Sequence, residues 1–140
     1  MSNKILVPVD GSENSRRALV QATSMSGEGS SITILYVIEA PPTVYIASQK
    51  LLDEAKAKFK EESVRMLDQY KALVQKSKAA IDTVALEGDA AQSIIDYAQK
   101  GRFDMIVMGS RGMGKLKGMV LGSVSRKVLH HAKCPVLIVK

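Results

Sequence analysis

The chain has 140 residues, of which 46% are hydrophobic and 24% charged, a composition that fits one globular domain over residues 1–140. Its net charge is +6, and its single cysteine, Cys134, excludes an internal disulfide and favours a reducing cytoplasm. No apolar run approaches the ~18 residues of a membrane helix and the N-terminus has no signal-peptide pattern, so neither a membrane span nor secretion is expected.

Five short apolar runs predict β-strands. Most of them are β-branched and nearly continuous, as in strands that are buried on both faces of a parallel sheet. The runs cover residues 5–9, 32–38, 81–86, 104–108 and 136–139.

Four helical stretches alternate with these runs. The first begins near Ser12, a good N-cap, and ends around Gly27 and Gly29. The others cover about residues 47–78, 89–101 and 119–132. The residues expected to face inward are Ala18, Leu19, Ala22, Met25, Leu52, Ala55, Phe59, Met66, Tyr70, Leu73, Ala91, Ile94, Ile95, Ala98, Leu121, Val124, Val128 and Ala132.

Strict alternation of strands and helices predicts an α/β fold: a five-stranded parallel sheet, doubly wound, with helices on both faces. Right-handed crossovers and a Rossmann-like strand order of 3-2-1-4-5 are expected. The insert at residues 39–44, which contains two consecutive prolines, is expected to be a stiff loop.

The segment 108–126 carries the strongest chemical signal. Its five glycines let backbone N–H groups approach a ligand, and it runs into a helix start, which favours phosphate. Its cationic and hydroxyl side chains include Arg111, Lys115, Lys117, Ser110, Ser123 and Ser125. The segment therefore predicts an anion site.

Two familiar phosphate motifs do not fit this segment. A P-loop could start at Gly109, but Leu116 stands where Ser or Thr would have to hold Mg²⁺. A dinucleotide fingerprint starting at Gly112 fails because Lys117 replaces its third glycine. The spacing that remains is a G-x2-G-x9-G-S loop over residues 109–123.

Asp10, which follows the first strand, is expected to meet this loop. Strands one and four are neighbours where the strand order reverses, and open α/β sheets bind ligands there. A carboxylate beside a triphosphate can hold a ribose hydroxyl or a hydrated metal ion. Asp10 and Ser12 are both also suited to cap the first helix.

Three segments together resemble the ATP-binding branch of the universal stress protein family: ILVPVDGS at residues 5–12, the G-x2-G-x9-G-S loop, and AKCPVLIV at residues 132–139. The resemblance covers the whole chain. It implies a cytoplasmic, ATP-binding regulatory protein of the stress response, with Mg²⁺ accompanying the nucleotide. It also implies a homodimer through the last strand, from Pro135 to Val139.

The resemblance further implies a set of nucleotide-binding residues. Those expected on or close to the phosphates are Met108, Gly109, Arg111, Gly112, Gly122, Ser123, Val124 and Ser125. Those expected on the ribose, metal and adenine side are Asp10, Pro8, Val9 and Val37. Asp10 would serve the ribose or, through water, the metal, and Val37 would face the adenine through its backbone.

Three functions remain open from the sequence. The first is a regulator in which nucleotide binding stabilises one conformation, and the second is a slow ATPase or nucleotidyl transferase with Asp10 helping to activate water. The third, a nucleic-acid-binding module, is prompted by the charge but is not expected, because aromatic residues make up only 4% of the chain and base-stacking motifs are missing. The spread of the charges favours a solvated surface.

Histidine and cysteine give no catalytic signal. His130 and His131 are expected in the last turn of the fourth helix, where the helix dipole favours them. Cys134 is expected to be a small buried residue.

Overall fold

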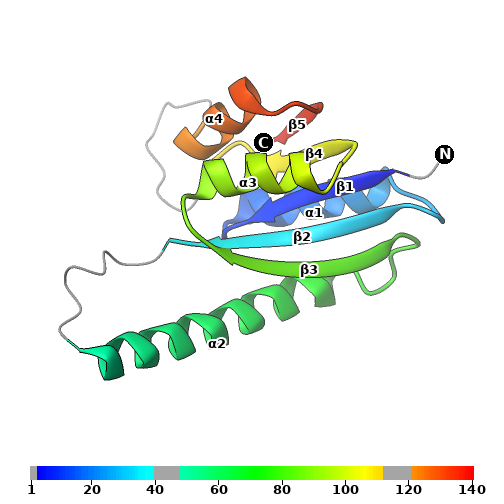
Figure 1. Ribbon diagram of the computed structural model, residues 1–140. Coiled ribbons are helices and arrows are strands. Elements are labelled where there is room, and N and C mark those ends of the chain that lie inside the picture. Colours follow the sequence, from blue (N-terminus) through cyan, green and yellow to red (C-terminus); the bar gives the residue numbers. More distant parts are fainter. Residues whose placement is uncertain (1–2, 40–47, 112–120) are drawn as a thin grey trace.

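A computed structural model describes residues 3–39, 48–111 and 121–140 (Figure 1). In these ranges, strands and helices alternate from beginning to end. They are β1 (Lys4–Val9), α1 (Glu13–Ser24), β2 (Ser31–Ile38), α2 (Gln49–Leu73), β3 (Ala80–Glu87), α3 (Ala90–Lys100), β4 (Met105–Gly109), α4 (Ser123–His131) and β5 (Val136–Val139). None of the helices in these ranges is long and apolar enough to cross a membrane.

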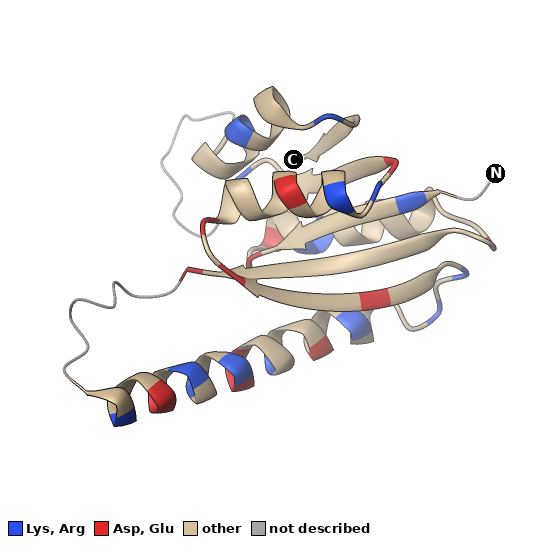
Figure 2. Cartoon of the chain, viewed as in Figure 1, with Lys and Arg blue, Asp and Glu red and all other residues tan. Residues whose placement is uncertain are grey.

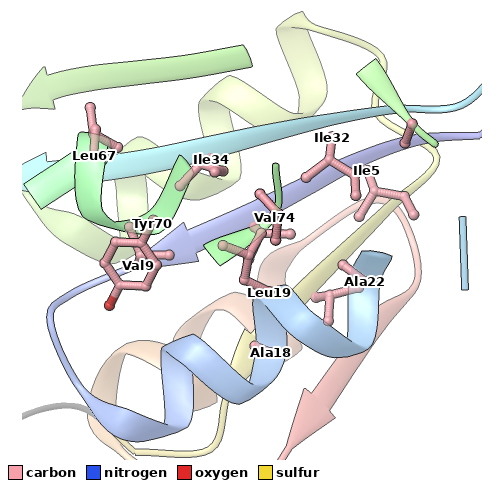
Figure 3. Close-up of a cluster of buried hydrophobic side chains, with 13 residues drawn as sticks. Ile5, Val9, Ala18, Leu19, Ala22, Ile32, Ile34, Leu67, Tyr70 and Val74 are labelled. Carbon is pink, nitrogen blue, oxygen red and sulfur yellow. The ribbon is translucent and has the colours of Figure 1, made fainter. Parts of the chain in front are cut away.

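The five strands form one parallel sheet of order β3-β2-β1-β4-β5, which confirms the predicted architecture and strand order. Helices α1 and α2 cover one face of the sheet, and α3 and α4 cover the other. Alternate strand residues point to opposite faces, so each strand contributes side chains to both. On the α1–α2 face, the fully buried side chains include Ile5, Val7, Leu19, Ile32, Ile34 and Val107 (Figure 3).

The two edge strands are less buried than the sequence predicts. In β3, Asp82 and Thr83 are exposed, and every residue of β5 is half-buried. Each edge strand pairs with a single neighbour, so burial on both faces holds only for the central strands. A nearly continuous apolar run therefore did not distinguish a central strand from an edge strand here.

Helix α2 is shorter than predicted, and its inward face is different near the end. Leu73, expected to face inward, is 52% exposed, whereas Val74, the residue that ends the helix, is only 6% exposed. Ser63 is buried, which was not predicted from its polar side chain. Its hydroxyl can be buried because it donates to the Phe59 carbonyl of the same helix at 2.8 Å. Figure 2 shows Lys, Arg, Asp and Glu residues along the length of this helix.

The ends of α1 and α4 also correct the prediction. Met25, expected on the inward stripe, caps the C-terminus of α1 and is 39% exposed. Helix α4 begins at Ser123, four residues after the predicted start at Met119, which lies outside the described residues. Leu121 is half-buried but precedes the helix. Helix α4 therefore starts directly after Gly122.

Candidate functional site

A cavity of about 490 Å³ opens at the carboxyl ends of the central strands. Its walls come from the ends of β1, β2 and β4, the start of α1, the start of α3 and the N-terminus of α4. This is the place where the strand order reverses, at which open α/β sheets bind ligands. The volume lies within the range of about 300–1,000 Å³ typical of small-molecule sites.

Of the nucleotide-binding residues that the resemblance implies, every one that the structure describes lines this cavity: Pro8, Val9, Asp10, Val37, Met108, Gly109, Arg111, Gly122, Ser123, Val124 and Ser125. Ser110, predicted from composition to face the anion, is not among the lining residues. Gly112 lies outside the described residues, as do Lys115 and Lys117.

Several lining residues were missed by the sequence analysis: Ser12, Ser15, Leu35, Tyr36, Glu39, Ala90 and Ile94. Tyr36 and Glu39 belong to the same strand end as Val37, so their neighbourhood in the chain was an available signal. Nothing in the local pattern could indicate Ala90 and Ile94, because they reach the cavity through the path of the chain across the sheet.

The β1–α1 turn shows which of Asp10 and Ser12 caps α1. The side chain of Ser12 caps α1, accepting a hydrogen bond from the Ser15 N–H at 3.2 Å. The Asp10 carboxylate instead accepts from the Ser12 N–H at 2.9 Å through Oδ1. Asp10 is exposed at the cavity, and this bond uses one of its two carboxylate oxygens. Within residues 3–39, 48–111 and 121–140 the other oxygen accepts no hydrogen bond, so it can bind a hydroxyl or a metal-bound water.

Gly109 is required for packing as well as for any contact with a ligand. A Cβ added at this position would lie 2.8 Å from the Cβ of Asn14 and 2.9 Å from its carbonyl carbon. Real Cβ atoms do not approach backbone so closely, so α1 would have to move away from β4. From its place in the motif, Gly109 was expected only to let the backbone approach a phosphate.

The N-terminus of α4 faces the cavity without a side-chain cap. Gly122 is the N-cap residue and offers no side-chain acceptor to the first N–H groups of the helix. Its own N–H donates to the Ser110 carbonyl at 2.7 Å, which holds the helix start against the end of β4. Since no described side chain caps these first N–H groups, they and the positive end of the helix dipole make this wall suitable for an anion, with Arg111 adding a cation.

Two hydroxyls predicted to face an anion are used inside the protein. Ser125 donates to the Ser110 carbonyl at 2.9 Å, with the Gly122 carbonyl at 3.2 Å as the alternative acceptor. The Ser110 hydroxyl accepts from the Asn14 side-chain amide at 3.1 Å and is 2% exposed. These bonds fix the frame of the site, and the exposed Ser123 is the remaining hydroxyl of the three.

Metal-ligating clusters of three or more His, Cys, Asp or Glu residues are not found among the described residues. Mg²⁺ commonly combines one or two carboxylates with phosphate oxygens and water, and Asp10 beside the anion wall fits that pattern. His130 and His131 lie in the last turn of α4, as predicted. Cys134 is half-buried, and burial raises the pKa of its thiol.

Comparison with known proteins gives one consistent result. The model of the universal stress protein family matches residues 1–140. The universal stress protein YxiE of Bacillus subtilis is 36% identical over 149 residues, which cover 100% of both chains. The solved structure of MJ0577, a universal stress protein of Methanocaldococcus jannaschii, superposes with a TM-score of 0.89 at 28% identity, covering 99% of this chain and 95% of that one.

A second solved structure bears on the cavity. It is a universal stress protein in complex with cAMP, with a TM-score of 0.62 and 26% identity, covering 99% of this chain and 96% of that one.

Proposed function

The chain belongs to the universal stress protein family, and on that premise we propose that it is a cytoplasmic regulator that binds ATP with Mg²⁺ in the cavity described above. The proposal rests on the cavity at the strand-order reversal, where the N-terminus of α4, which has no side-chain cap from Gly122, lies near the exposed carboxylate of Asp10. Residues 1–140 act as one nucleotide-binding domain. A structural relative that binds cAMP supports an adenine nucleotide as the ligand.

The two ends of the cavity differ in chemistry, which sets the direction of the nucleotide. The phosphates lie against Gly109, Gly122 and Ser123, where the α4 N–H groups and Arg111 attract negative charge. Val124, Ser125 and Met108 complete that side, together with Gly112 from outside the described residues.

The ribose and adenine lie on the opposite side, along the ends of β1 and β2. Asp10 accepts from a ribose hydroxyl or from a water on Mg²⁺ through the oxygen that Ser12 leaves free. Pro8 and Val9 form the wall beside it, and the backbone of Val37 faces the adenine ring. Glu39 at the same strand end was not foreseen and adds a second carboxylate near the base.

The site favours binding over turnover. Hydrolysis requires a general base within hydrogen-bond reach of the attacking water, and Asp10 and Glu39 are the carboxylates among the described lining residues. Asp10 already accepts from the Ser12 N–H, so one of the two oxygens that could take a proton from water is engaged. A slow ATPase that uses Asp10 is therefore the second candidate.

The experiment is calorimetric titration with Mg-ATP, Mg-ADP, AMP and cAMP, followed by an assay of released phosphate. Gly122→Asp is the informative variant, because its carboxylate would cap α4 and repel phosphate while leaving the helix intact. Gly27→Asp makes the same charge change where a Cβ meets nothing within 4 Å, and it is the matched control. ATP binding that is lost in the first variant and retained in the second supports the proposal.

Equal binding in both variants would refute the assignment of the phosphates to α4. Phosphate release above background that disappears with Gly122→Asp would make the protein an ATPase. Binding without phosphate release would support the regulator.

We also infer a homodimer through the open edge of β5. The Pro135 carbonyl accepts from the N–H of Ile106 in β4, and the Val139 carbonyl accepts from the N–H of Ser110 directly after β4, both at 2.9 Å. The alternate residues Val136 and Ile138 therefore direct their backbone groups to the open edge. Ile138→Pro removes one outward N–H without touching the β4 pairing. Light scattering should then report a dimer for the wild type and a monomer for this variant; a monomeric wild type would refute the inference.

A further inference from the structure

One buried hydroxyl connects α2 to the β1–α1 turn. Tyr70 of α2 is 2% exposed, and its hydroxyl accepts a hydrogen bond from the Gly11 N–H at 3.0 Å. The same oxygen lies 2.5 Å from the Ser15 hydroxyl at the start of α1. In Figure 3 the Tyr70 ring lies close to Val9, with its hydroxyl directed toward the beginning of α1. Residues 55 and more positions apart are thus joined at one oxygen.

The direction of each bond follows from the number of protons. The Ser15 hydroxyl donates to the Ser12 carbonyl at 2.8 Å, so the proton between Tyr70 and Ser15 comes from the phenol. Tyr70 then accepts one bond and donates another, which satisfies both roles of its hydroxyl. Burial raises the pKa of Tyr70, so the phenol remains a neutral donor at physiological pH.

The turn that Tyr70 holds is the one that carries Asp10. Gly11 has a φ of +89°, and a Cβ at this position would lie 3.2 Å from the Met66 methyl group of α2. The next N–H, that of Ser12, orients the Asp10 carboxylate at 2.9 Å. Two successive N–H groups are therefore fixed, one by α2 and one by Asp10 itself. If the bond from the Gly11 N–H to Tyr70 is lost, the backbone of the turn is released, and the Ser12 N–H that orients Asp10 is no longer fixed.

We propose that Tyr70 is a positioning residue of the nucleotide site: its hydroxyl holds the Gly11 peptide so that Asp10 faces the bound nucleotide. The inference rests on the proposed function, and it assigns to α2 a role in that site although Tyr70 does not line the cavity. Because binding free energies are reciprocal, bound nucleotide also tightens the contact between α2 and the turn.

The test is a double-mutant cycle of Tyr70→Phe and Asp10→Asn, measured as the Kd for Mg-ATP. Tyr70→Phe alone should weaken binding roughly 5–50-fold, within the range of couplings between sites. In the Asp10→Asn background, where the amide oxygen can still accept from Ser12 but the charge is gone, the same change should have an effect below about twofold. Tyr97→Phe on α3, whose ring packs on Phe103 at 5.7 Å between centroids, is the matched control.

A second measurement does not depend on nucleotide. Hydrogen exchange of the Gly11 amide should accelerate in Tyr70→Phe, while amides of the central strands keep their protection. Ser15→Ala, which removes the acceptor of the phenol proton together with the bond from Ser15 to the Ser12 carbonyl, should accelerate exchange of the Gly11 amide in the same direction.

The possible results are distinct. Unchanged ATP affinity in Tyr70→Phe would overturn the inference, and so would an equal loss in both Asp10 backgrounds, since that is the behaviour of a residue that only stabilises the fold. Absence of Mg-ATP binding in the wild type would instead refute the proposed function, and the positioning role would fall with it.

Discussion

Replacing Gly109 with alanine tests whether this glycine serves packing independently of any ligand. The added Cβ would meet the Cβ, carbonyl carbon and carbonyl oxygen of Asn14 at 2.8, 2.9 and 3.1 Å. Two of these atoms are backbone, so the contact cannot be relieved by a side-chain rotation. Either α1 or the end of β4 has to shift.

The expected cost is that of overpacking a close contact, about 1–3 kcal/mol of the free energy of unfolding. The shift would also strain two hydrogen bonds that depend on the same frame. These are the Asn14 amide to Ser110 at 3.1 Å and the Arg17 guanidinium to the Lys140 carbonyl at 3.0 Å. At roughly 2–4 °C per kcal/mol, the melting temperature should fall by about 2–12 °C.

The assay is urea and thermal denaturation without nucleotide, followed by circular dichroism. Gly27→Ala is the matched control, because a Cβ there meets nothing within 4 Å and the change should leave stability unaltered. A Gly109→Ala protein as stable as Gly27→Ala, with only nucleotide binding lost, would refute the packing argument. Gly109 would then serve the phosphates alone.

Three further predictions concern single side chains. Ser12→Ala should lower the unfolding free energy by about 0.5–2 kcal/mol through loss of the α1 cap, whereas Ser24→Ala, on the exposed end of that helix, should change urea denaturation little. Burial raises the pKa of Tyr70 above its ordinary 10.0, so in alkaline solution the folded state keeps a phenol proton that the unfolded state releases. The stability contributed by the neutral phenol is complete below about pH 10 and is lost as pH rises through the folded pKa. Tyr70→Phe should therefore lose less stability than the wild type across that alkaline window, and parallel pH curves would contradict the account. Burial also raises the pKa of Cys134, so iodoacetamide should alkylate it more slowly than it alkylates free cysteine near about pH 8, and urea should remove the difference.

The order of the elements and of the strands was predictable because both follow from local pattern and general topology. Alternating apolar runs and helical stripes imply a parallel sheet, and the order 3-2-1-4-5 was expected as a common order of doubly wound sheets. The ends of elements were predicted less well. Leu73 continues the apolar stripe of α2 but is exposed, because the helix ends there and Val74 turns inward instead.

The polar contacts of the site could not be predicted from the sequence. Gly11 and Tyr70 are 59 positions apart, and only the packing of α2 on the sheet brings them together. Gly109 was evident from the sequence motif, but its contact with Asn14 depends on how closely α1 crosses β4. Ser110 and Ser125 matched the composition of an anion site, yet their hydroxyls bond to the protein itself.

The central position of β1 has a consequence for synthesis on the ribosome. Its pairing with β2 can form early, but its other neighbour, β4, follows about a hundred residues later: the Lys4 N–H donates to the Asp104 carboxylate across a separation of 100 positions. Until β4 has emerged, β1 has an open, apolar edge, the kind that pairs with foreign strands. A chain that stops before Met105 should therefore aggregate, and chaperones should engage nascent chains of that length.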